Sequence, residues 1–446
     1  MNLILRMPKK ALFVMFFLFA FLSINVILFI YNMASIPDII LYFLTFLSVY
    51  VQVFFLVTFL DNRKKIITRN GCNKLSKYPK VTILVPAWNE EKTIYKTIRS
   101  ILDLNYPKDK IKIFLINDGS TDKTWNVISK FTKFPNVSVF NKENGGKYTA
   151  LNLGLEHVET DFLGCLDADS VVDRDSLVRI MSYFEKDPTV MAVAPSIIAV
   201  NSKNFIQKAQ EAEYFLAVYM KKMLGFLGAI HVTPGPFTIF RKKVFDDLGP
   251  YKHAHNTEDM EIAYRMQKNN YKIEQCNDAY VYTNTPISVV KLYKQRVRWI
   301  YGSINNTIDY RGLIFKKKYG NFSFFTLPMI IISFVAVCYI LGKIAYNFID
   351  FLFSKITQFE VIGFHLSNKM NFFDPFFINT QSLFFISLIL YALVLFSIIL
   401  GRKMANDKNN YILGIFYYFI IFTIIGPFWL FKATYNTIFS RKPAWR

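Results

Sequence analysis

Cysteine is scarce in this chain and follows no pattern. The 446 residues include four cysteines, at positions 72, 165, 276 and 338, and no two of them form a closely spaced pair. Structural zinc sites and disulfide-stabilised domains both need cysteines at short or regular spacings. The distribution therefore disfavours both, and it is compatible with a reducing cytoplasm.

Charge is absent from five long stretches, which are Ala11–Tyr31, Ile39–Leu60, Asn321–Gly342, Pro375–Gly401 and Tyr411–Phe431. Each is long enough to cross the roughly 30 Å hydrocarbon core of a bilayer, where a central charge would cost about 3 kcal/mol. We therefore predict an integral membrane protein, with two spans in residues 1–61 and about three in residues 321–446. The first stretch is too long for the core of a cleaved signal peptide, and a second span follows it, so we expect an anchor.

Basic residues are also missing from the link between the first two stretches, residues 32–38, whereas they flank the pair at residues 6–10 and 63–65. The positive-inside rule then places both flanks, and the domain that follows, in the cytoplasm. Five spans would leave the basic C-terminal tail outside, against the same rule. Either segment Asp350–Asp374 contains a re-entrant or additional crossing, or the rule fails at this end.

Acidic residues are too few to balance the basic ones. Asp and Glu number 32 against 53 Lys and Arg, which gives a net charge of +21. This excess predicts affinity for anionic membrane lipids and for phosphate-bearing substrates. No nucleic-acid recognition motif accompanies it, so nucleic acid is not an expected partner. The sequence also lacks a Ser–His–Asp nucleophile set, and we expect His231, His253 and His255 to be surface or packing residues.

Between the membrane regions, residues 62–320 have the size of one large domain. Short apolar runs predict strands at Val81–Pro86, Ile111–Ile116, Val137–Phe140 and Phe162–Leu166. Helical periodicity predicts helices at Glu90–Leu104, Thr121–Phe131, Tyr148–His157 and Asp175–Phe184. This alternation favours an α/β fold with a parallel sheet covered on both faces, which binds ligands at the carboxyl ends of its strands.

Two later segments, Asn204–Leu227 and Ser288–Ile304, mix apolar and aromatic residues with basic ones. This mixture is typical of helices that lie along a membrane surface. The second segment also lies close in sequence to the C-terminal spans. We therefore expect the domain to dock against the bilayer.

Polar clusters follow the first two predicted strands. Glu90 lies in "PAWNEE" and Asp118 in "NDGSTD", and each has a structural explanation, as an acid in the first helical turn or as a turn residue. Lys147 follows two glycines but lacks the spacing and the Ser or Thr of a P-loop. A lysine near a helix start could nevertheless reach a diphosphate.

Asp167 and Asp169 in "DADS" form a stronger signal at the end of the fourth strand. In an extended chain both side chains leave the same face, and at about 4 Å in a half-wet site they would repel by roughly 4 kcal/mol. One interpretation is a helix cap beside a solvated strand end. The other is a site for Mg²⁺ or Mn²⁺, completed by substrate phosphates.

Asp259 lies in "TED", at the start of a predicted helix. Favourable interaction with the helix dipole explains an acid at this position, and so does a role as general base facing a cleft. Further along, Gln295, Arg298 and Trp299 in "QRVRW" share one helix face. The tryptophan could anchor an interfacial helix or stack on a sugar, and the arginine could bind a diphosphate.

The order of these clusters is more specific than any one of them. The sequence from "PAWNEE" through "NDGSTD", "NGGK", "DADS", "TPGPFTIFR", "TED" and "QRVRW", flanked by membrane spans, resembles the membrane-bound family-2 glycosyltransferases. This branch contains hyaluronan, cellulose, chitin and poly-N-acetylglucosamine synthases. The resemblance, over about Val81–Tyr301, implies a GT-A fold and inverting transfer of a sugar, N-acetylglucosamine or glucose in type, from a UDP-sugar.

By this resemblance each cluster acquires a role. Asp259 would be the catalytic base, and Asp167 and Asp169 would bind Mg²⁺ or Mn²⁺. The nucleotide-sugar would contact Ala87, Glu90, Asp118, Lys147 and Arg298, and the acceptor would contact Gly235, Pro236, Phe237, Gln295 and Trp299. The segment "TPGPFTIFR" departs from cellulose synthases, whose motif has a Phe-Cys-Gly character, and is closer to the hyaluronan and chitin-oligomer type. The sugar therefore stays open.

The implied product is a growing β-linked polysaccharide at the cell membrane, made by a multi-pass protein with a cytoplasmic catalytic domain. The expected partners are a UDP-sugar, an oligo- or polysaccharide acceptor and membrane lipids, and the family allows accessory secretion subunits. A single-transfer enzyme acting on a lipid or polyprenyl phosphate is the alternative within this class. A catalytically silent scaffold or transporter subunit is the alternative outside it, although it would not need these motifs together.

Overall fold

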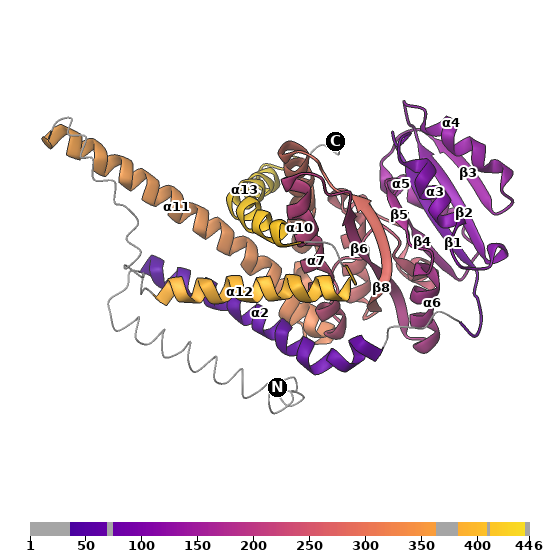
Figure 1. Ribbon diagram of the computed structural model, residues 1–446, viewed down its shortest axis with the longest axis horizontal. Coiled ribbons are helices and arrows are strands. Elements are labelled where there is room, and N and C mark those ends of the chain that lie inside the picture. The colour runs from indigo at the N-terminus through magenta and orange to yellow at the C-terminus, as the bar shows by residue number, and fades with distance from the viewer. Residues whose placement is uncertain (1–35, 69–74, 363–381, 408–410, 442–446) are drawn as a thin grey trace. The chain divides into compact units, whose positions relative to one another are not determined.

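The structure, a computed structural model, describes residues 36–68, 75–362, 382–407 and 411–441. In these residues eight strands form one sheet in the order β3-β2-β1-β4-β7-β6-β8-β5 (Figure 1). The strands are β1 (Val81–Ala87), β2 (Ile111–Asp118), β3 (Val137–Lys142), β4 (Phe162–Cys165), β5 (Ser170–Val172), β6 (Val190–Val200), β7 (Ile239–Arg241) and β8 (Lys272–Asn284).

The sheet is mixed, so the prediction of a parallel sheet is correct for only half of it. Strands β3, β2, β1 and β4 are parallel neighbours, as expected. Strand β7 is antiparallel to both β4 and β6, and β5 is antiparallel to β8. The two long strands β6 and β8 run parallel to each other. The sequence analysis does not predict the four later strands. For β5 and β7 the reason is length, since three residues are too few to show a periodicity.

Helices cover both faces of the parallel half of the sheet. From β1 to the end of α10 the chain forms the helices α3 (Ile94–Leu102), α4 (Thr124–Ile128), α5 (Lys147–Glu156), α6 (Ser176–Lys186), α7 (Phe205–Phe226), α8 (Lys243–Leu248), α9 (Glu258–Lys268) and α10 (Val289–Asp309). Alternate residues of β1 divide between the two faces, since Ile83 packs in one core with α3 and α6, while Leu84 meets α5 at Gly154.

The helices of the structure differ from the predicted ones mainly at their ends. Helix α3 begins at Ile94 rather than at Glu90, because residues 90–93 form a turn in which the carbonyl of Glu90 accepts two backbone N–H groups. The predicted helix Thr121–Phe131 is only the short α4, and a 3-10 helix at Ser129–Lys133 follows it. The two basic-aromatic segments are helices, α7 and α10. Their N-caps are Asn204 and Ser288, whose side chains accept backbone N–H groups of the first turn.

Four further helices are long and apolar. They are α2 (Ile36–Thr68), α11 (Leu327–Ile362), α12 (Ser382–Met404) and α13 (Ile412–Ile438). A π-helix, Phe322–Thr326, directly precedes α11. In the described part of the chain, four segments of these helices are long and apolar enough to cross a membrane, at Ile39–Ile66, Phe322–Thr357, Phe384–Met404 and Ile412–Ile438. The predicted first span, Ala11–Tyr31, lies outside the described residues. Helix α11 continues through Asp350 to Ile362, and the remainder of the segment suspected of an additional crossing also lies outside them.

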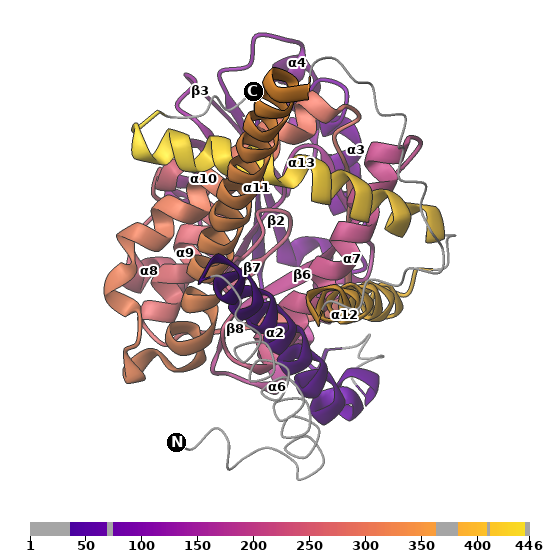
Figure 2. The same ribbon diagram turned by 90° about the vertical axis from the view of Figure 1, so that its left-hand side faces the viewer.

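The chain divides into two compact units, each of which has its own apolar contacts. One unit comprises the described parts of Met1–Asp61 and Met329–Phe396, where Val49, Val53 and Val57 of α2 pack with Ile386 of α12. The other comprises Asn62–Pro328 and Ser397–Arg446. Within this second unit α13 packs across α7 and α10 (Figure 2), through a cluster that includes Ile206, Leu292 and Trp429.

Candidate active site

The site lies at the carboxyl edge of the parallel strands. Strand β1 is hydrogen-bonded to both β2 and β4, so the loops that follow these three strands are neighbours. The first two loops are also tied directly, since Asn89 Oδ1 accepts the N–H of Thr121 and the N–H of Glu90 is donated to Thr124 Oγ1. Three predicted polar clusters are thereby brought to one edge.

Asp118 organises the glycine loop before α5. Its side chain is 3% exposed, and its carboxylate accepts the backbone N–H groups of Gly145 and Gly146 and pairs with Lys142 at 2.7 Å. A carboxylate can accept about four hydrogen bonds, and these three contacts occupy most of that capacity in Asp118. Asp118 holds the loop that presents Lys147, and its predicted contact with the nucleotide stays a prediction.

Lys147 joins two carboxylates that are far apart in sequence. Its ammonium lies 2.7 Å from Asp167 Oδ1 and 3.1 Å from Glu258 Oε1. Burial acts to lower the pKa of Lys147, but the charges of Asp167 and Glu258 outweigh it and raise the pKa well above its usual value. Burial acts to raise the pKa of Glu258, but Lys147 and a backbone hydrogen bond together outweigh it, so this pKa is lowered. Lys147 is therefore a fixed cation between the turn after β4 and the start of α9.

Gly235 leaves room for this cation. A Cβ at this position would lie 2.5 Å from Lys147 Nζ and 3.2 Å from an oxygen of Asp167, so any larger residue would displace them. Pro236 is half-buried beside it. Phe237 differs from its neighbours, since its side chain is fully buried in the core, in a left-handed conformation with φ 63°. Its aromatic ring therefore supports the loop from behind.

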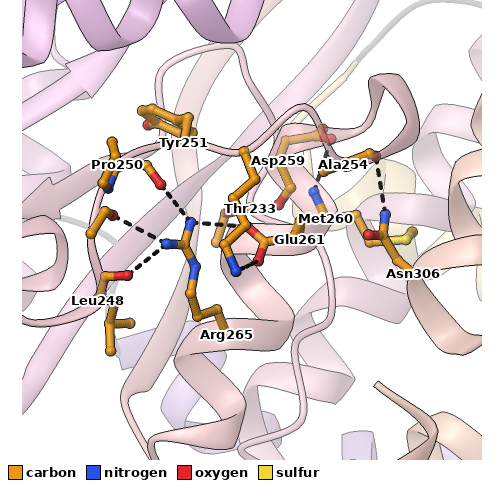
Figure 3. Close-up of polar contacts among 12 residues, drawn as sticks. Thr233, Leu248, Pro250, Tyr251, Ala254, Asp259, Met260, Glu261, Arg265 and Asn306 are labelled. Atoms are coloured by element: carbon orange, nitrogen blue, oxygen red, sulfur yellow. Dashed lines mark hydrogen bonds and ion pairs between the residues drawn. The ribbon is translucent and has the colours of Figure 1, made fainter. Parts of the chain in front are cut away.

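Asp259 faces the same small pocket as Lys147. The pocket is lined by Lys147, Leu151, Cys165, Thr233, Pro234, Gly235, Phe240, Tyr251, Glu258, Asp259 and Ile262. The carboxylate of Asp259 accepts the N–H of Met260, and the backbone carbonyl of Asp259 accepts both the N–H and the hydroxyl of Thr233 (Figure 3). Burial, and then the charge of Glu258, raises the pKa of Asp259 to about 6. A carboxylate with a raised pKa is suited to act as a general base near neutral pH.

Asp169 stands in a region of excess negative charge. Burial, followed by the charges of Asp167 and Glu90, raises its pKa to about 6. A hard divalent cation with oxygen ligands fits such a pair of carboxylates. In the described residues no group of three or more His, Cys, Asp or Glu side chains converges, so a metal held by Asp167 and Asp169 would take its other ligands from substrate or water.

The residues of "QRVRW" lie on α10. Arg298 donates through Nη1 to the carbonyl of Asn256 at 3.2 Å, which ties this helix to the turn before Asp259. Gln295 accepts from Arg296, whose guanidinium lies 4.2 Å from the ring centre of Trp299. The tryptophan keeps 37% of its surface exposed, so one part of its ring remains accessible for stacking.

Several residues at the site had no signal in the sequence. Tyr251 lines the pocket from the loop after α8, which Arg265 fixes by donating to the carbonyls of Leu248, Gly249 and Pro250 (Figure 3). Lys221 on α7 acts electrostatically on Asp259, although burial lowers its own pKa to about 8. Glu258 could have been inferred, since it adjoins Asp259 in the same motif.

The comparisons with known proteins agree with this geometry. Residues 82–249 match the family described as "Glycosyl transferase family 2". The chain has a family-2 glycosyltransferase domain. Its eight-stranded mixed sheet is that of the GT-A fold, and the matched region contains the Asp167–Asp169 pair and Lys147.

Among relatives of this chain is a poly-β-1,6-N-acetyl-D-glucosamine synthase of Staphylococcus epidermidis, 29% identical over 322 residues, which are 71% of this chain and 74% of the relative. The synthase of the same name from Staphylococcus aureus strain COL is 33% identical over 224 residues, 50% of this chain and 54% of the relative. The mannosyltransferase PcManGT of Pyrobaculum calidifontis, solved with GDP-Man and Mn²⁺, matches in fold with a TM-score of 0.53 and 15% identity, covering 89% of this chain and 99% of that one.

Proposed function

We propose that this glycosyltransferase moves N-acetylglucosamine from UDP-N-acetylglucosamine to the end of a growing β-1,6-linked polymer, with inversion at the anomeric carbon. The observation that carries the proposal is the shared pocket, which Asp259 and Lys147 both line and where Lys147 pairs with Asp167. The sugar and the linkage are supported by the names of the staphylococcal relatives.

In the proposed reaction Asp259 accepts the proton of the acceptor hydroxyl, which for a β-1,6 linkage is the C6 hydroxyl of the terminal sugar. That oxygen forms a bond to the anomeric carbon as the bond from this carbon to the diphosphate breaks. Lys147 and Arg298 stabilise the negative charge that develops on the leaving UDP. Both cations lie on elements that also contact the segment around Asp259, which supports this assignment.

Asp167 and Asp169 would hold a Mg²⁺ or Mn²⁺ ion, which when bound supplies Lewis-acid stabilisation of the diphosphate. Trp299 would stack on the terminal sugar of the acceptor, and Gln295 and the loop at Gly235 would contact the same sugar. We further propose that the catalytic unit faces the cytoplasm, where nucleotide-sugars are available. The basic flanks of the apolar stretches support this orientation.

The test is an assay of the purified full chain in detergent or vesicles with radiolabelled UDP-N-acetylglucosamine. The proposal expects UDP release together with a ladder or smear of product that a β-1,6-specific hexosaminidase degrades. UDP-glucose serves as the competing donor, and Asp259→Asn serves as the inactive control. A single lipid-linked sugar would instead establish the single-transfer alternative, and absence of UDP release would refute a glycosyltransferase function.

A further inference from the structure

The side of helix α10 that carries Arg298 continues past "QRVRW" to the end of the helix. Arg298, Gly302, Asn306 and Asp309 follow one another at intervals of four, four and three residues, so they lie on one side of the helix. All four meet the short segment Ala254–Thr257, which directly precedes Glu258 and Asp259. Helix α10 thus carries Arg298, the predicted diphosphate ligand, and also the residues that contact the segment leading into Asp259, the predicted base.

The supported segment is held in an unfavourable backbone conformation. Ala254, His255 and Asn256 have φ values of 45°, 55° and 64°, all in the left-handed region. Residues with a Cβ avoid this region, and runs of them are rarer still. Such a turn persists only where its surroundings fix it. The contacts from α10 are therefore needed to hold the backbone that leads into Asp259.

Asn306 supplies the most buried of these contacts. It is 1% exposed, and its Nδ2 donates to Thr257 Oγ1 at 2.8 Å and to the carbonyl of Ala254 at 3.5 Å, as Figure 3 shows for Ala254. The hydroxyl of Thr257 in turn donates to the same carbonyl at 2.9 Å. The side-chain amide of Asn306 therefore bonds to both the first and the last residue of the turn, Ala254 and Thr257. At the rim His255 Nε2 lies 2.9 Å from Asp309 Oδ2.

Gly302 allows the turn to approach the helix. A Cβ at this position would lie 2.8 Å from the Cβ of Thr257 and closer still to its Oγ1 and Cγ2. Alanine is favoured over glycine inside a helix, so the preference of the helix itself does not account for a glycine here. The close approach to Thr257 does. Gly312, just beyond the end of α10, has no atom within 4 Å of the corresponding position.

We propose that Gly302 and Asn306 are positioning residues for the transfer reaction, and that they fix Asp259 relative to Arg298 by holding the turn Ala254–Thr257 against α10. The inference rests on the proposed function of Asp259 and Arg298 and extends it to two residues outside the recognised motif. Neither residue touches substrate in this scheme. Their effect is on the geometry of proton acceptance, so they control kcat more than donor binding.

The first test is Gly302→Ala, with Gly312→Ala as the matched control. Because a displacement of about 1 Å can cost about 100-fold in rate, we expect Gly302→Ala to lower kcat by at least about 10-fold. Its KM for UDP-N-acetylglucosamine should stay within about twofold, since the donor contacts are intact. We also expect the acidic midpoint of its pH–kcat profile to shift. Gly312→Ala should match the wild type in all three measurements.

The second test is a double-mutant cycle. Thr257→Ala removes the two atoms that lie closest to the new methyl group, but it also removes the hydroxyl that accepts from Asn306, so it should lower kcat by itself. Because both changes disturb one contact, the loss of kcat in Gly302→Ala/Thr257→Ala should be smaller than the product of the two single losses. A structural defect at Gly302 that did not involve this contact would give independent, additive effects. Asn306→Leu, which removes the donor at similar size, should also lower kcat with little change in KM. Asn305→Leu is its control, because Asn305 bonds instead to Tyr301 and Thr437.

The outcomes separate this inference from the proposed function. If the wild type does not release UDP, the proposed function fails, and non-additive thermal midpoints of Gly302→Ala and Thr257→Ala would still verify the contact itself. If the wild type is active, a normal kcat and pH profile for Gly302→Ala and Asn306→Leu would overturn the inference. Additive loss in the double variant would do the same. If Gly302→Ala does not fold, the kcat values of the double variant and of Asn306→Leu test the inference.

Discussion

The Lys147 ammonium lies 2.7 Å from Asp167 and thereby joins the glycine loop to the turn after β4. The same nitrogen lies 3.1 Å from Glu258, at the start of the helix that carries Asp259. Side-chain exposures of 17%, 30% and 5% place the three groups at the edge of the protein interior. One cation therefore balances two carboxylates from segments that are distant in sequence.

Replacing Lys147 by Met should remove activity and destabilise the fold. Removing one partner of a buried ion pair leaves an uncompensated charge and typically costs about 3–5 kcal/mol, so we expect the free energy of unfolding to fall by about 3 kcal/mol. Denaturant unfolding and UDP release measure the two effects. Lys112→Met is the control, since Lys112 pairs with Glu159 at the surface, and it should leave both quantities unchanged. Equal stability of the two variants would contradict the role assigned to Lys147.

The pH dependence of kcat should report on Asp259. A general base must be ionised, and burial and the charge of Glu258 raise the pKa of Asp259 to about 6. We therefore expect kcat to rise with pH through this region and to level off above it. Asp259→Asn should abolish transfer while UDP binding, measured by calorimetry, stays close to that of the wild type. Wild-type turnover by this variant would exclude Asp259 as the base.

The same raised pKa predicts a stability change of definite sign. The folded protein retains a proton on Asp259 up to about pH 6, whereas the usual pKa of the group is 3.8. Stability from this group is thus present at low pH and is lost as pH rises through that window. Asp259→Asn imitates the neutral carboxyl, so its thermal midpoint should exceed that of the wild type at pH 8 and should match it at pH 4. The opposite order would show that the carboxylate is stabilised in the fold.

Metal dependence should follow from Asp167 and Asp169. We expect EDTA to stop transfer and Mg²⁺ or Mn²⁺ to restore it, because two adjacent carboxylates and a diphosphate otherwise accumulate negative charge. Asp169→Asn should weaken Mn²⁺ binding in the presence of UDP, as measured by calorimetry or by Mn²⁺ electron paramagnetic resonance. Asp173→Asn, four residues after Asp169 and just beyond β5, serves as the control. Transfer that persists in EDTA would refute the metal site.

Arg265 should act on the pocket through Tyr251. Its guanidinium donates to three backbone carbonyls of residues 248–250 and to Glu261, a set that one ammonium cannot reproduce. We expect Arg265→Lys to lower the free energy of unfolding by about 2 kcal/mol and to raise KM by displacing Tyr251. Arg311→Lys, at an exposed position, is the control. An unchanged KM would show that the loop at residues 248–251 does not contribute to substrate binding.

Several features could be predicted from the residues alone. The apolar runs at β1, β2 and β4 predict parallel strands, whose carboxyl ends must meet at one edge. Glu90, Asp118 and Asp167 were therefore expected at this edge, and the structure places Asp118 at the end of β2 and the other two in the loops after β1 and β4. The charge-free runs likewise predict the long helices α2, α11, α12 and α13. The antiparallel insertion of β7 could not be predicted, because its three residues pair only with strands that are distant in sequence.

The sequence by itself determined which chemical groups reach the carboxyl edge and which segments are apolar enough for a membrane, because period and composition are local properties. Only the tertiary structure decided that Lys147 lies between Asp167 and Glu258, that the pKa of Asp259 is raised, and that Gly302 lets a strained turn rest on α10. These depend on distances between segments far apart in the chain and on the exclusion of water around them. Neither is fixed until the chain has folded.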